Sequence, residues 1–339
     1  FQAKRASARL MAIVAEGVRG RVYLSPQQEH EAVAESAKPK WVPEAEMNQD
    51  CKDLVSGRGY GFKKWHQIFT PRQLVALTTF SDLVAEAREK IATDAAAAAT
   101  LADDKRPLRE GGRGHIAYSE AVSVYLGIAL SRLTNSLNSL SLWSTSREQT
   151  VNLFSRQAIP MVWDYPEINP TAGAAGDYSI ACDSIARAMD GVPASETNEG
   201  VAYQHDAASN SFVERSVLIS SDPPYYDNIS YADLSDFFYV WMRPPLHNVF
   251  PALFATVVVP KAEELVAASY RHGSYGNAEK FFLQGMTRAM QGMAKRSAEA
   301  FPVTLYYAFR QSEQHSEGIS STGWETFLDA VLEAGLGVN

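Results

Sequence analysis

Cysteine is scarce in this chain of 339 residues, which contains only Cys51 and Cys182. The two are far apart in sequence and neither belongs to a C-x-x-C pair, so we expect neither a disulfide framework nor a zinc site. The histidines form no ligand-spaced pair, and we predict that the chain binds no metal. Few cysteines without a disulfide pattern are typical of the reducing cytoplasm, where we expect the protein to act.

Long hydrophobic runs are missing as well, although 46% of the residues are hydrophobic. No uninterrupted apolar stretch approaches the roughly 18 residues of a membrane-spanning helix, so we expect no membrane association. The first ten residues contain three basic groups but lack the apolar core and cleavage site of a signal peptide. The chain starts with Phe1 on a helical pattern, which indicates a piece of a longer protein.

Basic residues are not in excess, and the formal net charge is −8. Because phosphate binding favours basic surfaces, the overall charge argues against a nucleic-acid partner. This argument is weak, since an acidic chain can still carry a basic groove. The charge alone therefore leaves DNA and RNA open as partners.

The hydrophobic pattern divides the chain into three regions. Residues 1–59 contain a strand pattern at 17–25 and a proline-broken stretch, and we interpret them as a partial α/β segment. The pattern at 60–150 predicts two long helices, and we interpret these residues as a helical accessory region inserted into the fold. The first helix should begin after Thr70, with Pro71 at its first position and Gln73 at the capping-box position. Residues 151–339 form the candidate catalytic region.

The last third of the chain alternates between strand and helix patterns. A β-prone run at 217–220 precedes a helix at 231–242, which Pro244 and Pro245 should end. A second β-prone run at 303–309 precedes a helix at 323–334. This order predicts a parallel α/β sheet, in which ligands bind at the carboxyl ends of the strands.

The tetrapeptide Asp222-Pro223-Pro224-Tyr225 lies at such an end and matches the [DNS]-P-P-[YFW] motif of enzymes that methylate amino groups. The amino nitrogen of adenine is a poor nucleophile because its lone pair is delocalised into the ring. A carboxylate at Asp222 and the carbonyl of Pro223 would each accept one N–H bond and so localise the lone pair. Tyr225 would stack on a base flipped out of the duplex. The same four residues also form ordinary turns.

Five longer stretches resemble the large prokaryotic adenine-specific DNA methylases described as containing a zinc ribbon, in the same order. The resemblance implies a Rossmann-like methyltransferase fold, S-adenosylmethionine as methyl donor and adenine in DNA as substrate. It also implies a restriction or defence-system partner. The matching stretches are YGFKKWHQIFTPRQLVALTTFSDLV at 60–84, FSRQAIPMVWDY at 154–165, SDPPYYDNISYADLSDFFYVW at 221–241, PKAEELVA at 260–267 and GWET at 323–326.

Site residues follow from this resemblance and from position in the chain. The tetrapeptide becomes the amino-binding motif, and Asp206 becomes an acidic residue that holds the cofactor, although His205 stands where glycine is more usual. Four further residues lie beside the motif or at the end of the second β-prone run. The candidate DNA contacts are Tyr226, Asn228, Tyr231 and Arg310.

The chain also departs from the family. Methyltransferases of this fold carry a Gly-rich loop after their first strand, and the nearest counterpart here is 172–177. It follows Asn169 and Pro170 rather than a β-prone run and opens no clear helix, so we interpret it as an ordinary loop. The zinc-ribbon cysteines are absent, and the chain ends before the last strands of the fold. We therefore expect an incomplete Rossmann-like sheet with only part of a cofactor site.

Three functions stay open. The first is an adenine-N6 DNA methyltransferase, favoured by Asp222 and by the resemblance. The second is a methyltransferase acting on cytosine N4 or on RNA, although serine at the first motif position is more usual for cytosine. The third is a catalytically incomplete DNA-binding fragment, favoured by the missing Gly-rich loop. We also expect aromatic residues at 237–241 to pack a helix onto the sheet, and 261–273 to form a mobile loop over the site.

Overall fold

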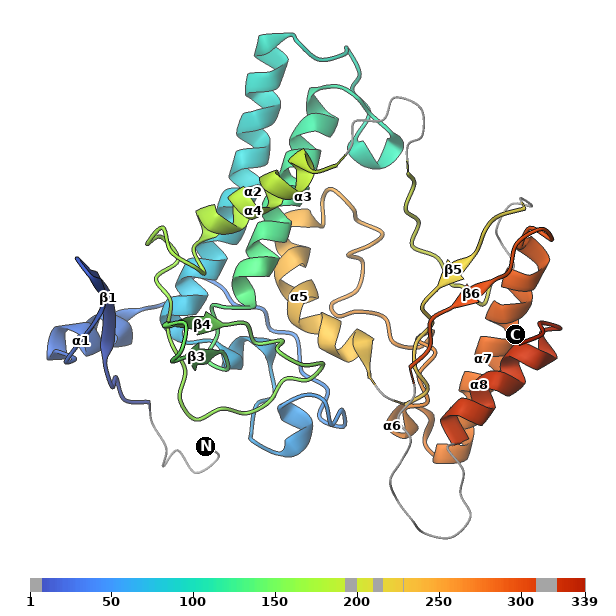
Figure 1. The fold of residues 1–339 in the computed structure, drawn as a ribbon. Coiled ribbons are helices and arrows are strands. Elements are labelled where there is room, and N and C mark those ends of the chain that lie inside the picture. Colours follow the sequence, from blue (N-terminus) through green and yellow to red (C-terminus); the bar gives the residue numbers. More distant parts are fainter. Residues whose placement is uncertain (1–7, 193–199, 210–215, 228, 309–321, 339) are drawn as a thin grey trace. The chain divides into compact units, whose positions relative to one another are not determined.

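The computed structural model describes residues 8–192, 200–209, 216–227, 229–308 and 322–338 (Figure 1). These residues form an α/β protein with eight α-helices and three two-stranded sheets, and they do not build a complete Rossmann sheet. The chain divides into two compact units. Phe1–Ala194 and Asp233–Val259 form the first, and Ser195–Ala232 and Pro260–Asn339 form the second.

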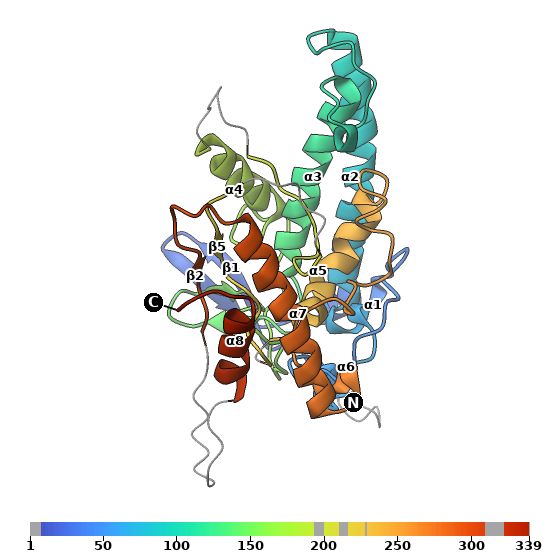
Figure 2. The same cartoon turned by 90° about the vertical axis from the view of Figure 1, so that its right-hand side faces the viewer.

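The first unit is mainly helical, and α2 and α3 run side by side in both views (Figure 1, Figure 2). Two antiparallel strand pairs, β1–β2 and β3–β4, accompany the helices. The helices are α1 (Gln28–Ser36), α2 (Pro71–Ala98), α3 (His115–Thr134), α4 (Tyr178–Asp190) and most of α5 (Tyr231–Leu246). The strands are β1 (Ile13–Gly17), β2 (Gly20–Leu24), β3 (Leu142–Ser144) and β4 (Gln149–Val151).

Helix α2 begins as its sequence predicts. The Gln73 amide donates to Oγ1 of Thr70 at 3.2 Å, and the Thr70 amide donates to Oε1 of Gln73 at 2.8 Å. These reciprocal bonds satisfy two amides at the start of the helix. Leu74, Leu77 and Val84 of this helix are buried. The predicted capping box is confirmed.

Helix α5 differs from its prediction in two ways. It continues through Pro244 and Pro245 to Leu246, so the expected end before the prolines is wrong. Proline has the φ angle of a helix, but each of the two lacks the amide hydrogen that would bond to the carbonyl four residues earlier. The helix also does not pack onto a sheet: Phe237 and Trp241 are fully buried, with ring centroids 5.9 and 5.2 Å from that of Phe69. Its aromatic residues join the core of the first unit.

The second unit contains the parallel strands β5 (Ser220–Ser221) and β6 (Thr304–Leu305) and the helices α6 (Ser269–His272), α7 (Tyr275–Arg296) and α8 (Thr322–Glu333). Figure 1 shows α7 and α8 on the same side of the strand pair. The parallel pairing is confirmed, but the strands are shorter than predicted, and Val217 forms only an isolated bridge with Ser297. Pro223 has no amide hydrogen and cannot extend the ladder beyond β5.

Candidate functional site

The carboxyl ends of β5 and β6 lie at the same edge because the two strands are parallel. The Thr304 amide donates to the Ile219 carbonyl at 3.0 Å, and the Tyr306 amide donates to the Ser221 carbonyl at 2.9 Å. Asp222 therefore leaves the sheet beside the residues that follow β6. The sequence prediction that Asp222 stands at the end of a parallel strand is confirmed.

The tetrapeptide presents its carboxylate to solvent on a partly buried turn. Asp222 is exposed and Pro223 is buried, which fixes the turn against the protein. The hydroxyl of Tyr225 donates to Oδ1 of Asp222 at 3.1 Å. This bond to the carboxylate, more than burial, raises the pKa of Tyr225 above its ordinary value. The two side chains with predicted roles in chemistry and stacking are thus in direct contact.

Tyr307, which follows β6, supports the motif from the neighbouring strand. Its hydroxyl accepts the Tyr226 amide at 3.1 Å, and its ring stands edge-on to that of Tyr225, with centroids 5.3 Å apart. Behind it, Phe327 of α8 stacks at 3.8 Å, with 11° between the rings. Burial raises the pKa of Tyr307, and its neutral phenol oxygen accepts the Tyr226 amide.

Sequence reasoning did not single out Tyr307. The β-prone run at 303–309 predicted a strand here, but it gave no sign of which aromatic side chain would turn toward the motif. Trp324, within the GWET stretch, lies with its ring centroid 5.9 Å from that of Tyr307. The resemblance of the GWET stretch was the only sequence signal that pointed to the surroundings of Tyr307.

Tyr226 does not lie where a DNA contact would need it. Only 5% of the residue is exposed, and its ring packs edge-on against Phe282 of α7 with centroids 5.1 Å apart. Burial raises its pKa strongly. The expectation that its side chain faces DNA is therefore corrected: the ring belongs to the apolar core of the second unit, because its neighbours there are α7 and α8.

The other candidate DNA contacts divide between described and undescribed residues. Tyr231, the first residue of α5, is 42% exposed. Asn228 and Arg310 lie outside the described residues. Tyr231 is accordingly the only one of the four candidates with a described, exposed side chain.

Asp206, the candidate cofactor ligand, lies in an exposed turn of the second unit. Its Oδ1 accepts the Ala208 amide at 2.9 Å, and its carbonyl accepts the Ser209 amide at 3.0 Å. The carboxylate thus closes a local turn while remaining open to solvent. This arrangement allows a further hydrogen bond from a hydroxyl group.

The Gly-rich stretch at 172–177 opens a helix, contrary to expectation. Asp177 is the N-cap of α4, and its carboxylate accepts the amides of Gly173 at 2.7 Å and Ser179 at 2.6 Å. Burial acts to raise the pKa of Asp177, but these bonds outweigh it and lower the pKa overall. Because this carboxylate already occupies the amides, the loop does not offer them to an anionic ligand.

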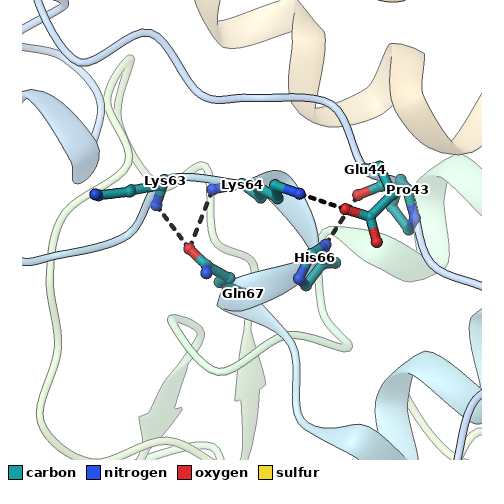
Figure 3. Close-up of polar contacts among 6 residues, drawn as sticks. All are labelled: Pro43, Glu44, Lys63, Lys64, His66 and Gln67. Carbon is teal, nitrogen blue, oxygen red and sulfur yellow. Dashed lines mark hydrogen bonds and ion pairs between the residues drawn. The ribbon is translucent and has the colours of Figure 1, made fainter.

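Lys63 and Lys64 lie near the start of the accessory region. Figure 3 shows Lys64 pairing with Glu44, with Nζ 2.5 Å from Oε2. The backbone amides of Lys63 and Lys64 both donate to Oε1 of Gln67, at 2.7 and 3.1 Å. The Lys64 charge is therefore already partly balanced within this segment.

The part of the chain that the structure describes contains neither a cluster of metal-ligating side chains nor a membrane-spanning helix. No group of three or more His, Cys, Asp or Glu side chains there is arranged to hold a metal ion. Of the helices described, none is both long and apolar enough to cross a membrane.

In comparisons with known proteins, no family model, curated protein or solved structure matches this chain.

Proposed function

We propose that the chain is a DNA methyltransferase that uses S-adenosylmethionine and acts on N6 of an adenine flipped out of the duplex. One observation carries the proposal: the exposed Asp222 carboxylate, at the end of a parallel strand, is in contact with the Tyr225 phenol. The sequence resemblance supports it independently. A Rossmann-like sheet, a cytoplasmic location and a restriction or defence-system partner belong to the same proposal.

Asp222 would act by accepting a hydrogen bond from the target amino group. An ionised carboxylate next to that N–H concentrates electron density on the nitrogen, and the Pro223 carbonyl would accept the second N–H. The nitrogen then carries a directional lone pair for attack on a methyl group. Its extra proton can leave to water after the transfer, so no strong general base is required.

Tyr225 would hold the flipped base by stacking. An aromatic ring stacks on any base, and flipping removes the base from the stack in which its amino group cannot be reached. Tyr307 limits the positions of the Tyr225 ring by standing edge-on to it. The Tyr225 hydroxyl must release the Asp222 carboxylate before the base can take its place.

The described residues do not fit a complete S-adenosylmethionine site. Asp206 could accept a ribose hydroxyl, but the amides of Gly173 and Ser179 are already bonded to Asp177. S-adenosylmethionine would supply the electrophilic methyl group. The residues discussed here supply the half of the reaction that binds and activates the amino group.

The test is methylation of DNA by the purified chain and its variants, with mass spectrometry of the digested nucleosides. We expect N6-methyladenine with the wild type, and a loss of about 100- to 1,000-fold with Asp222→Ala, because one preorganised electrostatic contact is removed. Asp329→Ala, which removes an exposed carboxylate on α8, is the matched control and should retain activity. Wild-type activity in Asp222→Ala would refute the proposal.

The same assay separates the alternatives. N4-methylcytosine or methylated RNA as the main product would identify the related amino-methyltransferase. The Gly173 amide of the Gly-rich loop is already bonded to Asp177. This favours the third candidate, a DNA-binding fragment without catalysis. That candidate predicts no methylated product together with DNA binding that depends on Tyr225.

A further inference from the structure

The motif loop, defined here as residues 226–227 and 229–232, contains no helix or strand before α5 begins at Tyr231. Nevertheless Ile229, Ser230 and Ala232 are buried, at 4, 6 and 7% exposure. Buried backbone and hydroxyl groups must find hydrogen-bond partners, because leaving them unpaired costs free energy. The partners of this loop therefore identify what holds it in place.

Three bonds reach the motif loop from one short segment, residues 264–271, which we call the anchor segment. The Ala267 amide donates to the Tyr226 carbonyl at 2.7 Å. The Tyr270 hydroxyl donates to Oγ of Ser230 at 2.9 Å. The Ala232 amide donates to Oε1 of Glu264 at 2.8 Å. The bonds are spread from the start to the end of the loop.

Glu264 joins two parts of this arrangement. While Oε1 accepts the Ala232 amide, Oε2 pairs with Nη1 of Arg271 at 2.5 Å, and only 15 and 10% of these two side chains are exposed. A carboxylate at the first turn of a helix is also favoured by the helix dipole. An ion pair so well shielded is screened little by salt and keeps its geometry.

The anchor segment is itself attached to the core. Val266 and Ala267 are buried, at 1 and 3% exposure. Leu265 packs so closely on Gly285 of α7 that a Cβ at that glycine would lie 2.2 Å from Leu265 Cδ2. The segment expected to be a mobile loop is therefore packed into the second unit, and it can serve as a fixed support.

We propose that Glu264, Tyr270 and Arg271 are positioning residues that hold the motif loop, which joins the Asp222 and Tyr225 pair to Tyr231 at the start of α5. This inference rests on the proposed function. The three residues touch neither base nor donor and act through the loop. Loss of the support should weaken productive binding of DNA, with less effect on the rate once the base is seated.

Two variants test the support. Tyr270→Phe removes the hydroxyl that bonds to Ser230. Glu264→Ala removes the carboxylate that bonds both to the Ala232 amide of the loop and to Arg271. In both we expect amide hydrogen exchange within 229–232 to accelerate by up to about 10-fold, as expected for the loss of one hydrogen bond. Glu264→Gln, which keeps an oxygen for the Ala232 amide, should restore part of the protection. Tyr306→Phe and Glu299→Ala, at exposed positions of the same unit, are matched controls.

Kinetics distinguish positioning from a purely structural role. Tyr270→Phe should raise KM for DNA by about 3- to 10-fold while kcat changes by less than about twofold. Unchanged exchange rates in both variants, or a fall in kcat with an unchanged KM, would overturn the inference. A wild-type chain that methylates nothing would count against the proposed function alone, while the exchange rates would still decide whether the anchor segment holds the loop.

Discussion

Asp222 and Tyr225 satisfy each other in the free protein, and this contact has a consequence for catalysis. Oδ1 of Asp222 accepts the Tyr225 hydroxyl, and Oδ2 is the second acceptor of the same carboxylate. Under the proposed function, the hydroxyl competes with the target amino group for Oδ1.

Replacing Tyr225 by phenylalanine isolates this competition. Tyr225→Phe keeps the ring for stacking and removes the competing hydroxyl, so we expect kcat/KM for DNA to rise by about 2- to 10-fold, the usual effect of one hydrogen bond. Tyr225→Ala, which also removes the ring, should lower it by about 5- to 150-fold. Steady-state methylation kinetics measure both. A large fall in activity with phenylalanine would mean that the hydroxyl takes part in the reaction.

Neighbouring tyrosines show what the sequence can and cannot tell at this scale. Tyr225 and Tyr226 are adjacent and chemically identical, yet one borders the Asp222 carboxylate and the other lies in the core. The motif singled out Tyr225 as a site residue but did not predict its contact with Asp222. The position of Tyr226 could not be predicted, because its burial depends on Phe282, which is distant in sequence. Tyr307 was missed for the same reason.

At the scale of single elements, local sequence signals were reliable where the structure depends on local bonds. The start of α2 follows from Thr70 and Gln73, which bond to each other. The end of α5 did not follow from Pro244, because the rest of that helix is held by aromatic packing from Phe69 and neighbouring residues. Tertiary packing outweighed a local helix-breaking signal.

Asp177 offers a prediction about α4. Its carboxylate caps the helix and also bonds to Gly173, so Asp177→Ala should lower the free energy of unfolding by about 1–2 kcal/mol at pH 7. Denaturant unfolding followed by circular dichroism measures the change. Asp183→Ala, on the exposed face of the same helix, is the matched control and should change stability by less than about 0.5 kcal/mol.

The pH dependence of this difference has a defined sign. The pKa of Asp177 is lowered in the folded protein, so its stabilisation is present above the unfolded pKa of about 3.9 and is lost as pH falls through the lower folded pKa. The stability gap between wild type and Asp177→Ala should therefore shrink in acid. If the stability difference between wild type and Asp177→Ala stayed constant from pH 7 to pH 2.5, the charge of Asp177 would not be the source of its stabilising effect.

On the scale of the whole molecule, the sequence predicted parallel strands and two long helices within 60–150, and both are present. It did not predict that α5, which follows the motif, packs mostly with Trp65 and Phe69 in the first unit. Alternating hydrophobicity identifies which face of an element is buried but not the element against which it packs. The choice of partner depends on contacts between distant residues.

Charge distribution leads to a prediction about how DNA is bound. The net charge is −8, and residues 216–232 contain no lysine or arginine, so this stretch itself offers no cation to phosphates. Affinity should therefore come mainly from the seated base, and the cost of flipping should limit it. A mismatch opposite the target adenine removes part of that cost, and we expect it to tighten binding by about 10-fold or more.

Fluorescence anisotropy with matched and mismatched duplexes at several salt concentrations tests this. We expect a shallow salt dependence, corresponding to fewer than about four neutralised phosphates, because the field near the motif is not basic. The advantage of the mismatch should vanish in Tyr225→Ala, since no ring then receives the base, but persist in the phenylalanine variant. A steep salt dependence without mismatch preference would instead indicate binding through phosphates, at a surface distant from the motif and independent of a flipped base.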